Sequence, residues 1–221
     1  MIKIENLSKS FYHEKSESKI LKNISLHIEQ GECVILKGVS GSGKTTLLSL
    51  IAGLDRPSEG KIFIEQEPIS KLPDFFASKL RAKKIGMIFQ HFNLFEHLSV
   101  KENVTIPLIP SGLSMKEIDK KVEIALSLAN ISHKKNLTAS RLSGGEKQRT
   151  AIARALVANP DIVLCDEPTA NLDKENSLLF IKTVEQLHKL GKTIVIATHD
   201  PLFEHLNFKS RLVPMIDGQI V

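Results

Sequence analysis

The sequence predicts an α/β fold in which helices cover a parallel sheet. An antiparallel β part and an inserted helical part are expected beside this core. Two apolar runs, Ile162–Cys165 and Thr193–Thr198, are typical of strands buried on both faces, as in a covered parallel sheet. Segments 2–5 and 23–28 instead alternate between apolar and polar residues, which favours antiparallel strands with one solvent-facing side. Residues 91–158 carry repeated helix-start patterns, so we expect a helical part inserted between strands of the core.

The composition is that of an ordinary globular domain. The 221 residues are 42% hydrophobic and 25% charged, enough to bury a sizeable core. No apolar run approaches the roughly 18 residues that span a bilayer, and the N-terminus lacks the apolar stretch of a signal peptide, so we expect a cytoplasmic protein. The net charge of +5 comes from scattered lysines, which argues against nucleic acid as a partner. Cys33 and Cys165 lie in apolar runs and are expected to be buried thiols.

A glycine-rich stretch, Gly38–Thr46, carries the strongest functional signal. It fits the pattern G-x-x-x-x-G-K-[ST], with an apolar strand, 32–37, before it and a helix, 46–52, after it. Glycines let backbone N–H groups turn toward phosphate oxygens, and the start of a helix adds positive potential there. The lysine of such a loop reaches the β- and γ-phosphates, and the threonine hydroxyl binds Mg²⁺. The candidate nucleotide-binding residues here are Gly38, Ser40, Gly41, Ser42, Gly43, Lys44, Thr45 and Thr46.

Two aromatic residues near the N-terminus are candidates to hold a purine base. Phe11 and Tyr12 precede a polar loop that we expect over 13–19. A base stacks on any flat aromatic face, with a free energy of about 1–3 kcal/mol. Either residue could serve, and either could instead pack into the sheet.

Short elements are expected between the glycine loop and the helical part. We predict a strand over 61–64, a helix over 73–83 and an apolar strand over 85–89. Gln90 follows that strand directly, where an amide could contact Mg²⁺ or position a water molecule. At the other end of the chain, the pair Asp217-Gly218 predicts a hairpin.

Three Ser-x-x-Glu patterns predict helix starts in the helical part. They are capping boxes, in which the serine and glutamate side chains satisfy free N–H groups at the start of a helix. The pairs are Ser99/Glu102, Ser114/Glu117 and Ser143/Glu146. An apolar cluster precedes them, and it either packs internally or forms a groove for a partner; it consists of Phe92, Leu94, Phe95 and Leu98.

The third helix start contains two glycines that a capping box does not explain. Gly144 and Gly145 lie between Ser143 and Glu146, and a glycine in a helix costs about 1 kcal/mol relative to alanine. Such glycines are useful where something must approach the backbone closely, and a helix N-terminus attracts phosphate. Because the glycine loop already holds one set of phosphates, a second phosphate site suggests sharing between chains.

Charged and polar side chains follow two of the buried strands directly. Asp166 and Glu167 come after Ile162–Cys165, and His199 comes after Thr193–Thr198. Because the carboxyl ends of parallel strands meet at one edge of a sheet, we expect these side chains near the phosphates. There Asp166 would hold Mg²⁺ through water, Glu167 would be the general base, and His199 would hydrogen-bond the γ-phosphate.

These motifs, in this order, resemble those of the ATP-binding-cassette (ABC) ATPases, and the resemblance covers essentially the whole chain. It implies a RecA-like P-loop NTPase core with an antiparallel β subdomain over 1–90 and 159–221, and a helical subdomain with the signature motif over 91–158. It also implies ATP and Mg²⁺ as cofactors, a head-to-tail homodimer around two ATP, and Ser143, Gly144 and Gly145 covering the neighbour's phosphates. The family pattern further assigns Lys44 and Gln90 to catalysis, Thr45, Gln90 and Asp166 to the metal, and Phe11 and Asp173 to the nucleotide.

The finer pattern is similar to the subgroup of lipoprotein-releasing, macrolide-exporting and cell-division cassettes. The features are the short length, Glu146 in the signature, and the run 167–173, where Ala170 stands in place of a frequent glycine. One reading is an ATPase subunit that drives separate integral-membrane permease subunits and lies on the inner face of the membrane through them. The other is a non-transport ABC ATPase, coupled to cell division or another mechanical task. The transported substrate cannot be inferred, since it is set mainly by the membrane subunits.

Overall fold

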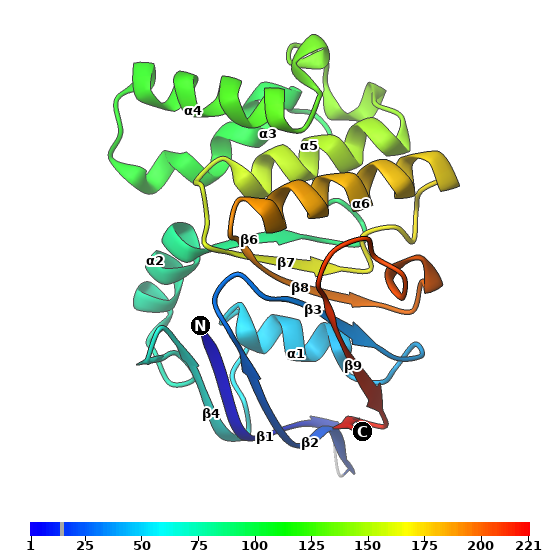
Figure 1. Cartoon of the computed structure of the whole chain (residues 1–221). Coiled ribbons are helices and arrows are strands. Elements are labelled where there is room, and N and C mark those ends of the chain that lie inside the picture. The colour runs from blue at the N-terminus through cyan, green and yellow to red at the C-terminus, as the bar shows by residue number, and fades with distance from the viewer. Residues whose placement is uncertain (14–15) are drawn as a thin grey trace.

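The computed structural model describes residues 1–13 and 16–221, and it shows two sheets with helices on and between them (Figure 1). The strands are β1 (Ile2–His13), β2 (Ser16–Ile28), β3 (Cys33–Lys37), β4 (Glu59–Ile64), β5 (Glu67–Pro68), β6 (Ile85–Ile88), β7 (Ile162–Asp166), β8 (Thr193–Thr198), β9 (Arg211–Ile216) and β10 (Gln219–Ile220). The α-helices are α1 (Lys44–Ile51), α2 (Asp74–Lys84), α3 (Val100–Thr105), α4 (Met115–Leu128), α5 (Gly144–Leu156) and α6 (Lys174–Lys189). Short 3₁₀ helices are η1 (Ile106–Ser111), η2 (Ser132–Lys134), η3 (Ala139–Arg141) and η4 (Pro201–Phe203).

The larger sheet is the predicted parallel sheet. Its strand order is β10-β9-β3-β8-β7-β6, and every pairing from β9 to β6 is parallel. All residues of β7 and β8 are buried, as their apolar composition predicts. The C-terminal hairpin is confirmed as well, with β9 and β10 antiparallel around Asp217 and Gly218, both at positive φ.

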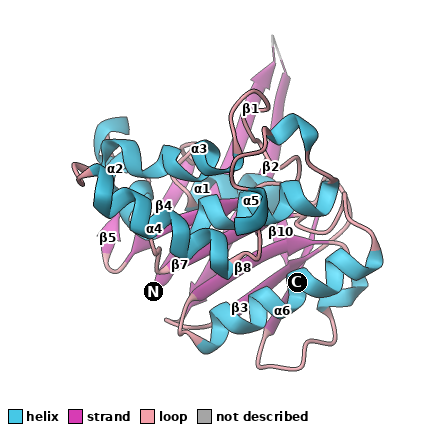
Figure 2. Ribbon diagram, turned by 90° about the horizontal axis from the view of Figure 1, so that it is seen from above, coloured by secondary structure: helices cyan, strands magenta, loops and turns pink. Residues whose placement is uncertain are grey.

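The smaller sheet is antiparallel, in the order β2-β1-β4-β5, and its first two strands are longer than predicted. The pairing of β1 with β2 continues as far as His13 and Ser16, so residues 16–19 of the expected polar loop belong to a strand. Residues 14–15 of that loop lie outside the described part. Register shifts interrupt the alternation of apolar and polar residues that predicts a strand from sequence. Backbone hydrogen bonds nevertheless continue to pair the two strands through their polar residues. The two strands extend together past the helices as a ribbon (Figure 2).

Two hydrophobic cores lie on the two faces of the parallel sheet. On β3, the alternate residues Cys33 and Ile35 point into one core, and Val34 and Leu36 point into the other. The first core is completed by α3, α4, α5 and α6, and the second by α1 and the antiparallel sheet. In Figure 1, α1 accordingly lies between the two sheets, and α6 and α5 lie above the parallel sheet. This layering gives both faces of the parallel sheet a cover.

The predicted helix starts are confirmed. Complete capping boxes begin α3, α4 and α5 at Ser99, Ser114 and Ser143. The helix expected over 73–83 is α2, shifted by one residue. The boundary of a helical subdomain at 91–158 stays a prediction, because α3, α4 and α5 share one continuous core with the sheet.

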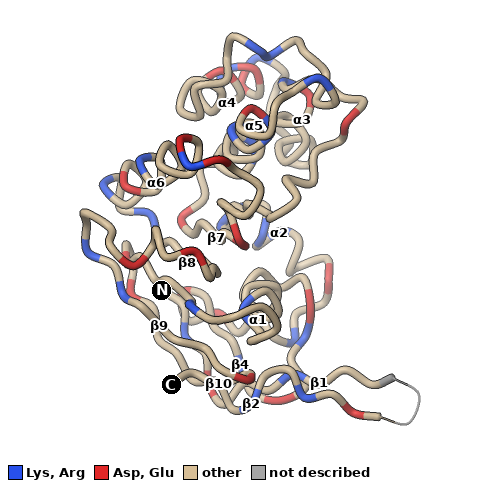
Figure 3. Tube along the Cα trace, turned by 90° about the vertical axis from the view of Figure 1, so that its right-hand side faces the viewer, with Lys and Arg blue, Asp and Glu red and all other residues tan. Residues whose placement is uncertain are grey.

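Charges of both signs are interspersed along the described chain (Figure 3).

The two cysteines are free and buried, as predicted, and burial raises the pKa of the Cys33 thiol to about 12. Among the helices that the structure describes, none is long and apolar enough to cross a membrane.

Candidate functional site

A pocket of about 400 Å³ lies at the carboxyl ends of β3, β6, β7 and β8. Four neighbouring parallel strands therefore deliver the residues that follow them to one edge of the sheet. The pocket is lined by Phe11, Ile20, Ser40, Gly41, Ser42, Gly43, Lys44, Thr45, Thr46, Gln90, Glu167 and His199. All but Ile20 are predicted site residues, and they come from distant parts of the chain.

The glycine loop, Gly38–Thr46, has the geometry of an anion cradle. Gly41 and Gly43 adopt φ values of 82° and 95°, a region that L-residues with side chains avoid. At Gly38, an added Cβ would lie 2.3 Å from the carbonyl oxygen of Met215. Gly43 is the N-cap of α1 and supplies no side-chain cap, so the first N–H groups of α1 remain available to a ligand. The arrangement fits a phosphate group.

Lys44 lies at the floor of the pocket and is 5% exposed. Its Nζ donates to the carbonyl oxygens of Gly38 and Val39, at 2.7 and 3.1 Å, and lies 3.4 Å from Oε1 of Glu167. The other carboxylate oxygen of Glu167 accepts from the backbone N–H of His199 and lies 3.0 Å from its Nδ1. Lysine, glutamate and histidine thus form one connected chain of polar contacts beside the loop. Glu167 itself has φ 42°, an uncommon conformation for a residue with a side chain.

The residues predicted to hold Mg²⁺ also converge. The Thr45 hydroxyl donates to Oδ1 of Asp166 at 2.8 Å, and Gln90 lines the same pocket. Burial raises the pKa of Asp166 above its ordinary value, although the hydrogen bond from Thr45 and the charge of Lys44 oppose that rise. In the described ranges, no group of three or more His, Cys, Asp and Glu side chains is placed to hold a metal. One carboxylate, a hydroxyl and an amide fit Mg²⁺, which prefers oxygen ligands and completes its shell with water and substrate phosphates.

Residues 21–170 match the family described as ABC transporter, and the match spans more than half of the chain. The chain belongs to the ABC transporter family. The match agrees with the resemblance inferred from the motifs and confirms the predicted ATPase class.

Individual relatives support the same assignment. The macrolide export ATP-binding/permease protein MacB of Campylobacter jejuni is 39% identical over all 221 residues. The cassette spans only about a third, 34%, of the length of that relative. The ABC transporter ATP-binding protein YknY of Bacillus subtilis is 40% identical, and the match covers 95% of its length. These matches are consistent with the macrolide-exporter subgroup.

Solved structures confirm the predicted fold class. The dimeric structure of MJ0796, a cassette from Methanocaldococcus jannaschii, superposes with a TM-score of 0.91 and 38% identity, covering all of this chain and 96% of that one. A second structure of MJ0796 shows a dimer in a post-hydrolysis state bound to ADP and Pi, with the same TM-score.

The structure separates the two aromatic candidates of this cassette. Phe11 lines the pocket and is 41% exposed, with Nζ of Lys9 4.8 Å from its ring centroid. Tyr12 is 74% exposed, is not among the lining residues, and its hydroxyl donates to Glu17 at 3.3 Å. The lining residue Ile20 was missed because β2 brings it to the pocket, and no local pattern marks it.

Besides Gly38 at the start of the glycine loop, four predicted nucleotide-binding residues are absent from the described residues that line this pocket. They are Ser143, Gly144 and Gly145, which we call the signature turn, and Asp173. The signature turn begins α5, and its capping box already uses the N–H groups of Ser143 and Glu146. Asp173 caps the start of α6. Within one chain, these residues therefore do not complete the site.

The structure also gives a local reason for one of the unexplained glycines. A Cβ added at Gly145 would lie 2.3 Å from Oδ1 of Asn176, so the side chain of Asn176 needs the space that the glycine leaves. At Gly144 the nearest atom to an added Cβ is the carbonyl oxygen of Asn171, at 3.5 Å. Sequence reasoning missed Asn176, since no local pattern relates it to Gly145.

Internal packing of the apolar loop after Gln90 is confirmed for Leu94, and a groove for a partner stays a prediction. Leu94 packs against the core, whereas Phe95 is 49% exposed. Phe92 has φ 60°, and its carbonyl oxygen accepts from the guanidinium of Arg154 at 2.6 Å. The backbone of this loop is thus tied to α5.

Proposed function

We propose that this chain binds Mg-ATP in the pocket of the glycine loop and hydrolyses it to drive separate integral-membrane permease subunits. The observation that carries the proposal is the convergence, at one sheet edge, of an uncapped helix start, a buried lysine, and the contact chain from Lys44 through Glu167 to His199. Each group has the chemistry that phosphoryl transfer to water requires.

Different residues of the pocket have different roles in ATP binding and hydrolysis. The loop N–H groups and Lys44 hold the phosphates, and Phe11 stacks on the base. Glu167 accepts the proton of the attacking water, and His199 hydrogen-bonds the γ-phosphate. Thr45, Asp166 and Gln90 would hold Mg²⁺, which neutralises charge on the phosphates when it is bound.

The signature turn, Ser143–Gly145, completes the site of a second copy in a head-to-tail dimer. In one chain the turn and Asp173 are absent from the described residues that line the pocket, and a Cβ at Gly144 would make only an ordinary contact with the carbonyl oxygen of Asn171, at 3.5 Å. The dimers of the relative MJ0796 support a shared arrangement.

The permease is proposed to be a separate chain, which places this subunit on the cytoplasmic face of the membrane. YknY and MJ0796 are matched over 95% and 96% of their lengths and are named as ATP-binding proteins or cassettes. The name of MacB, in contrast, joins ATP-binding and permease parts in a longer chain.

A groove between α2 and η1 suits a permease segment with apolar and acidic side chains. Its volume is about 480 Å³, and Pro107, Leu108 and Pro110 contribute apolar surface. The charged residues among those described that line it are Lys79, Lys83 and Lys121, so the groove is basic.

The test combines hydrolysis with dimerisation. Glu167→Gln keeps the size and hydrogen bonding of the side chain but cannot take a proton, so hydrolysis should fall by about 10²–10⁴-fold while ATP binding persists. The stalled chain should accumulate as a dimer with Mg-ATP and not with ADP, measured by light scattering. Ser143→Arg in the same background should abolish that dimer, since a bulky cation would occupy the turn that covers the phosphates.

Two results would contradict the proposal. Normal hydrolysis by the Glu167→Gln chain would remove Glu167 from its role as base. A chain that binds ATP and is inactive, yet stays monomeric even when its copurified membrane partner is added back, would exclude the shared site. Ser140→Arg, three residues before the turn, controls for the added charge.

A further inference from the structure

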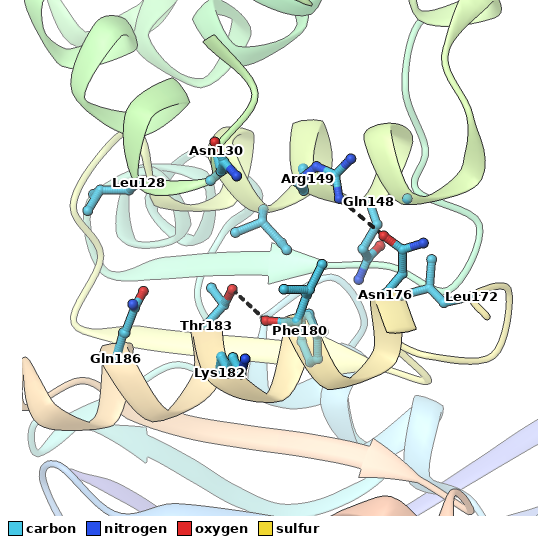
Figure 4. Close-up of a pocket in the computed structure, with 14 residues that line it drawn as sticks. Leu128, Asn130, Gln148, Arg149, Leu172, Asn176, Phe180, Lys182, Thr183 and Gln186 are labelled. Atoms are coloured by element: carbon cyan, nitrogen blue, oxygen red, sulfur yellow. Dashed lines mark hydrogen bonds between the residues drawn. The ribbon is translucent and has the colours of Figure 1, made fainter. Parts of the chain in front are cut away.

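The side chain of Asn176, in the third position of α6, contacts both α5 and the start of its own helix. Its Nδ2 donates to both carboxylate oxygens of Asp173, at 3.0 and 2.9 Å, and its backbone N–H donates to Oδ1 of Asp173 at 2.8 Å. On the other side, its Oδ1 accepts from Nη1 of Arg149 in α5 at 3.1 Å. Figure 4 shows the last of these bonds crossing from one helix to the other.

The amide of Asn176 also lies directly against the signature turn. A Cβ at Gly145 would come within 2.3 Å of its Oδ1, 2.6 Å of its Cγ and 2.9 Å of its Nδ2. Real Cβ atoms do not approach so closely, so the amide fits here only because residue 145 is glycine. The signature turn thus packs directly against a side chain of α6.

A local cavity lies beside this contact, although α5 and α6 share one apolar core. A cavity of about 230 Å³ is lined by residues of α5, α6 and the end of α4, among them Gly145, Asn130, Asn176 and Gln186, and Asn176 lies near the start of α6 (Figure 4). A second tie runs from Nε2 of Gln148 to the carbonyl oxygen of Pro168, at 2.9 Å, in the segment that leads to α6. At this end of the two helices, these polar contacts therefore add to the apolar core that α5 and α6 share.

We infer that Asn176 is a positioning residue that holds the signature turn and Asp173 in one fixed arrangement, so that both meet the neighbouring chain together. The inference rests on the proposed function, in which both elements face the nucleotide of the other chain. Its hydrogen bonds also help to lower the pKa of Asp173, which keeps that carboxyl charged. Asn176 is not among the described residues that line the pocket around Lys44, so ATP binding by a single chain should not depend on it.

The test measures dimer formation apart from ATP binding. In the Glu167→Gln background with Mg-ATP, Asn176→Ala should raise the protein concentration at half-dimerisation by about tenfold. The reason is that the signature turn and Asp173 would then have to be ordered when the two chains associate. The affinity of the monomer for a fluorescent ATP analogue should change by less than about twofold. The matched control is Thr183→Ala, which lines the same cavity but whose hydroxyl bonds only within α6, to Leu179. It should dimerise like the parent.

A double variant separates positioning from general damage. Gly145→Ala should lower the Tm of the nucleotide-free chain through its clash with Asn176, and adding Asn176→Ala should restore the Tm. The double variant should still dimerise poorly, since the link between α5 and α6 is lost.

The outcomes distinguish this inference from the proposed function. If the Glu167→Gln parent binds ATP but does not dimerise, the shared site fails and this inference fails with it. If the parent dimerises and Asn176→Ala dimerises at the same concentration, only the positioning role of Asn176 is overturned. A loss of dimer accompanied by equal loss of monomer ATP binding or of the cooperative thermal transition would also overturn it, as a purely structural effect.

Discussion

The glycine loop and the signature turn are both glycine-rich helix starts, but they satisfy their backbone groups in opposite ways. At the start of α1, Gly43 offers no side-chain cap, and Lys44 folds back onto carbonyl oxygens of its own loop. At the start of α5, Ser143 and Glu146 form a complete capping box. The glycines differ too, since Gly43 requires positive φ whereas Gly145 makes room for Asn176.

This contrast shows why similar patterns can have different functions. A helix start without a cap has N–H groups with no hydrogen-bond partner in the free chain, so a bound anion would satisfy them. A capped start is stable by itself, and it can serve as a rigid surface that another chain meets. In the proposed dimer, the loop binds the nucleotide and the turn covers it.

The largest expected effect comes from removing the charge in the glycine loop. Lys44→Ala should reduce ATP turnover by on the order of 10² or more, because the phosphates lose a charge-assisted contact in a buried site. Turnover and Mg-ATP affinity are measured together. Lys37→Ala is the control, since Lys37 pairs with Glu204 and is not among the residues that line the pocket. Unchanged binding and hydrolysis in Lys44→Ala would show that the loop is not the phosphate site.

A matched pair of glycine substitutions tests the contrast directly. Gly43→Ala should destabilise the chain by about 1–3 kcal/mol, since alanine is strained at φ 95° and its Cβ would meet the side chain of Leu21. Gly144→Ala should leave stability unchanged or raise it by up to about 1 kcal/mol, because the position is helical and an added Cβ would make only an ordinary contact, 3.5 Å from the carbonyl oxygen of Asn171. Urea unfolding of the nucleotide-free chain gives both values. Equal losses would mean that the two helix starts are not different in kind.

The smallest effect concerns two carboxyl groups, one beside each helix start. The pKa of Asp166 is raised by burial, so its charge costs stability above that pKa, and the cost disappears as the pH falls below the ordinary value. Asp166→Asn should therefore raise the Tm at pH 7 by roughly 2–4 °C, and the gain should vanish in acid.

The pKa of Glu146 is lowered, first by the hydrogen bond from the N–H of Ser143, so Glu146→Gln should lower the Tm at pH 7 and not in acid. Thermal unfolding measured across pH tests both variants. Changes in Tm of the same sign at pH 7 for Asp166→Asn and Glu146→Gln would contradict the difference proposed between the two helix starts.

Much of this fold could be predicted because its signals are local. The capping boxes at Ser99, Ser114 and Ser143 depend on side chains three residues apart, and all three form. Except for Asp166 and the terminal residues Thr193 and Thr198, strands β7 and β8 are apolar, and the sequence shows such apolar runs because both faces of these strands are covered. The polar ends of β1 and β2 could not be predicted, since cross-strand hydrogen bonds hold them without any alternation of side chains.

By itself, the sequence determined the glycine loop, the strand-end residues Asp166, Glu167 and His199, and the α/β class, because each depends on neighbours along the chain. The tertiary structure alone decided that Phe11 rather than Tyr12 lines the pocket and that Ile20 joins it. It also decided that Asn176 lies against Gly145, 31 positions away. Such contacts arise where separate elements pack, and packing depends on the shapes of surfaces that no short stretch of sequence contains.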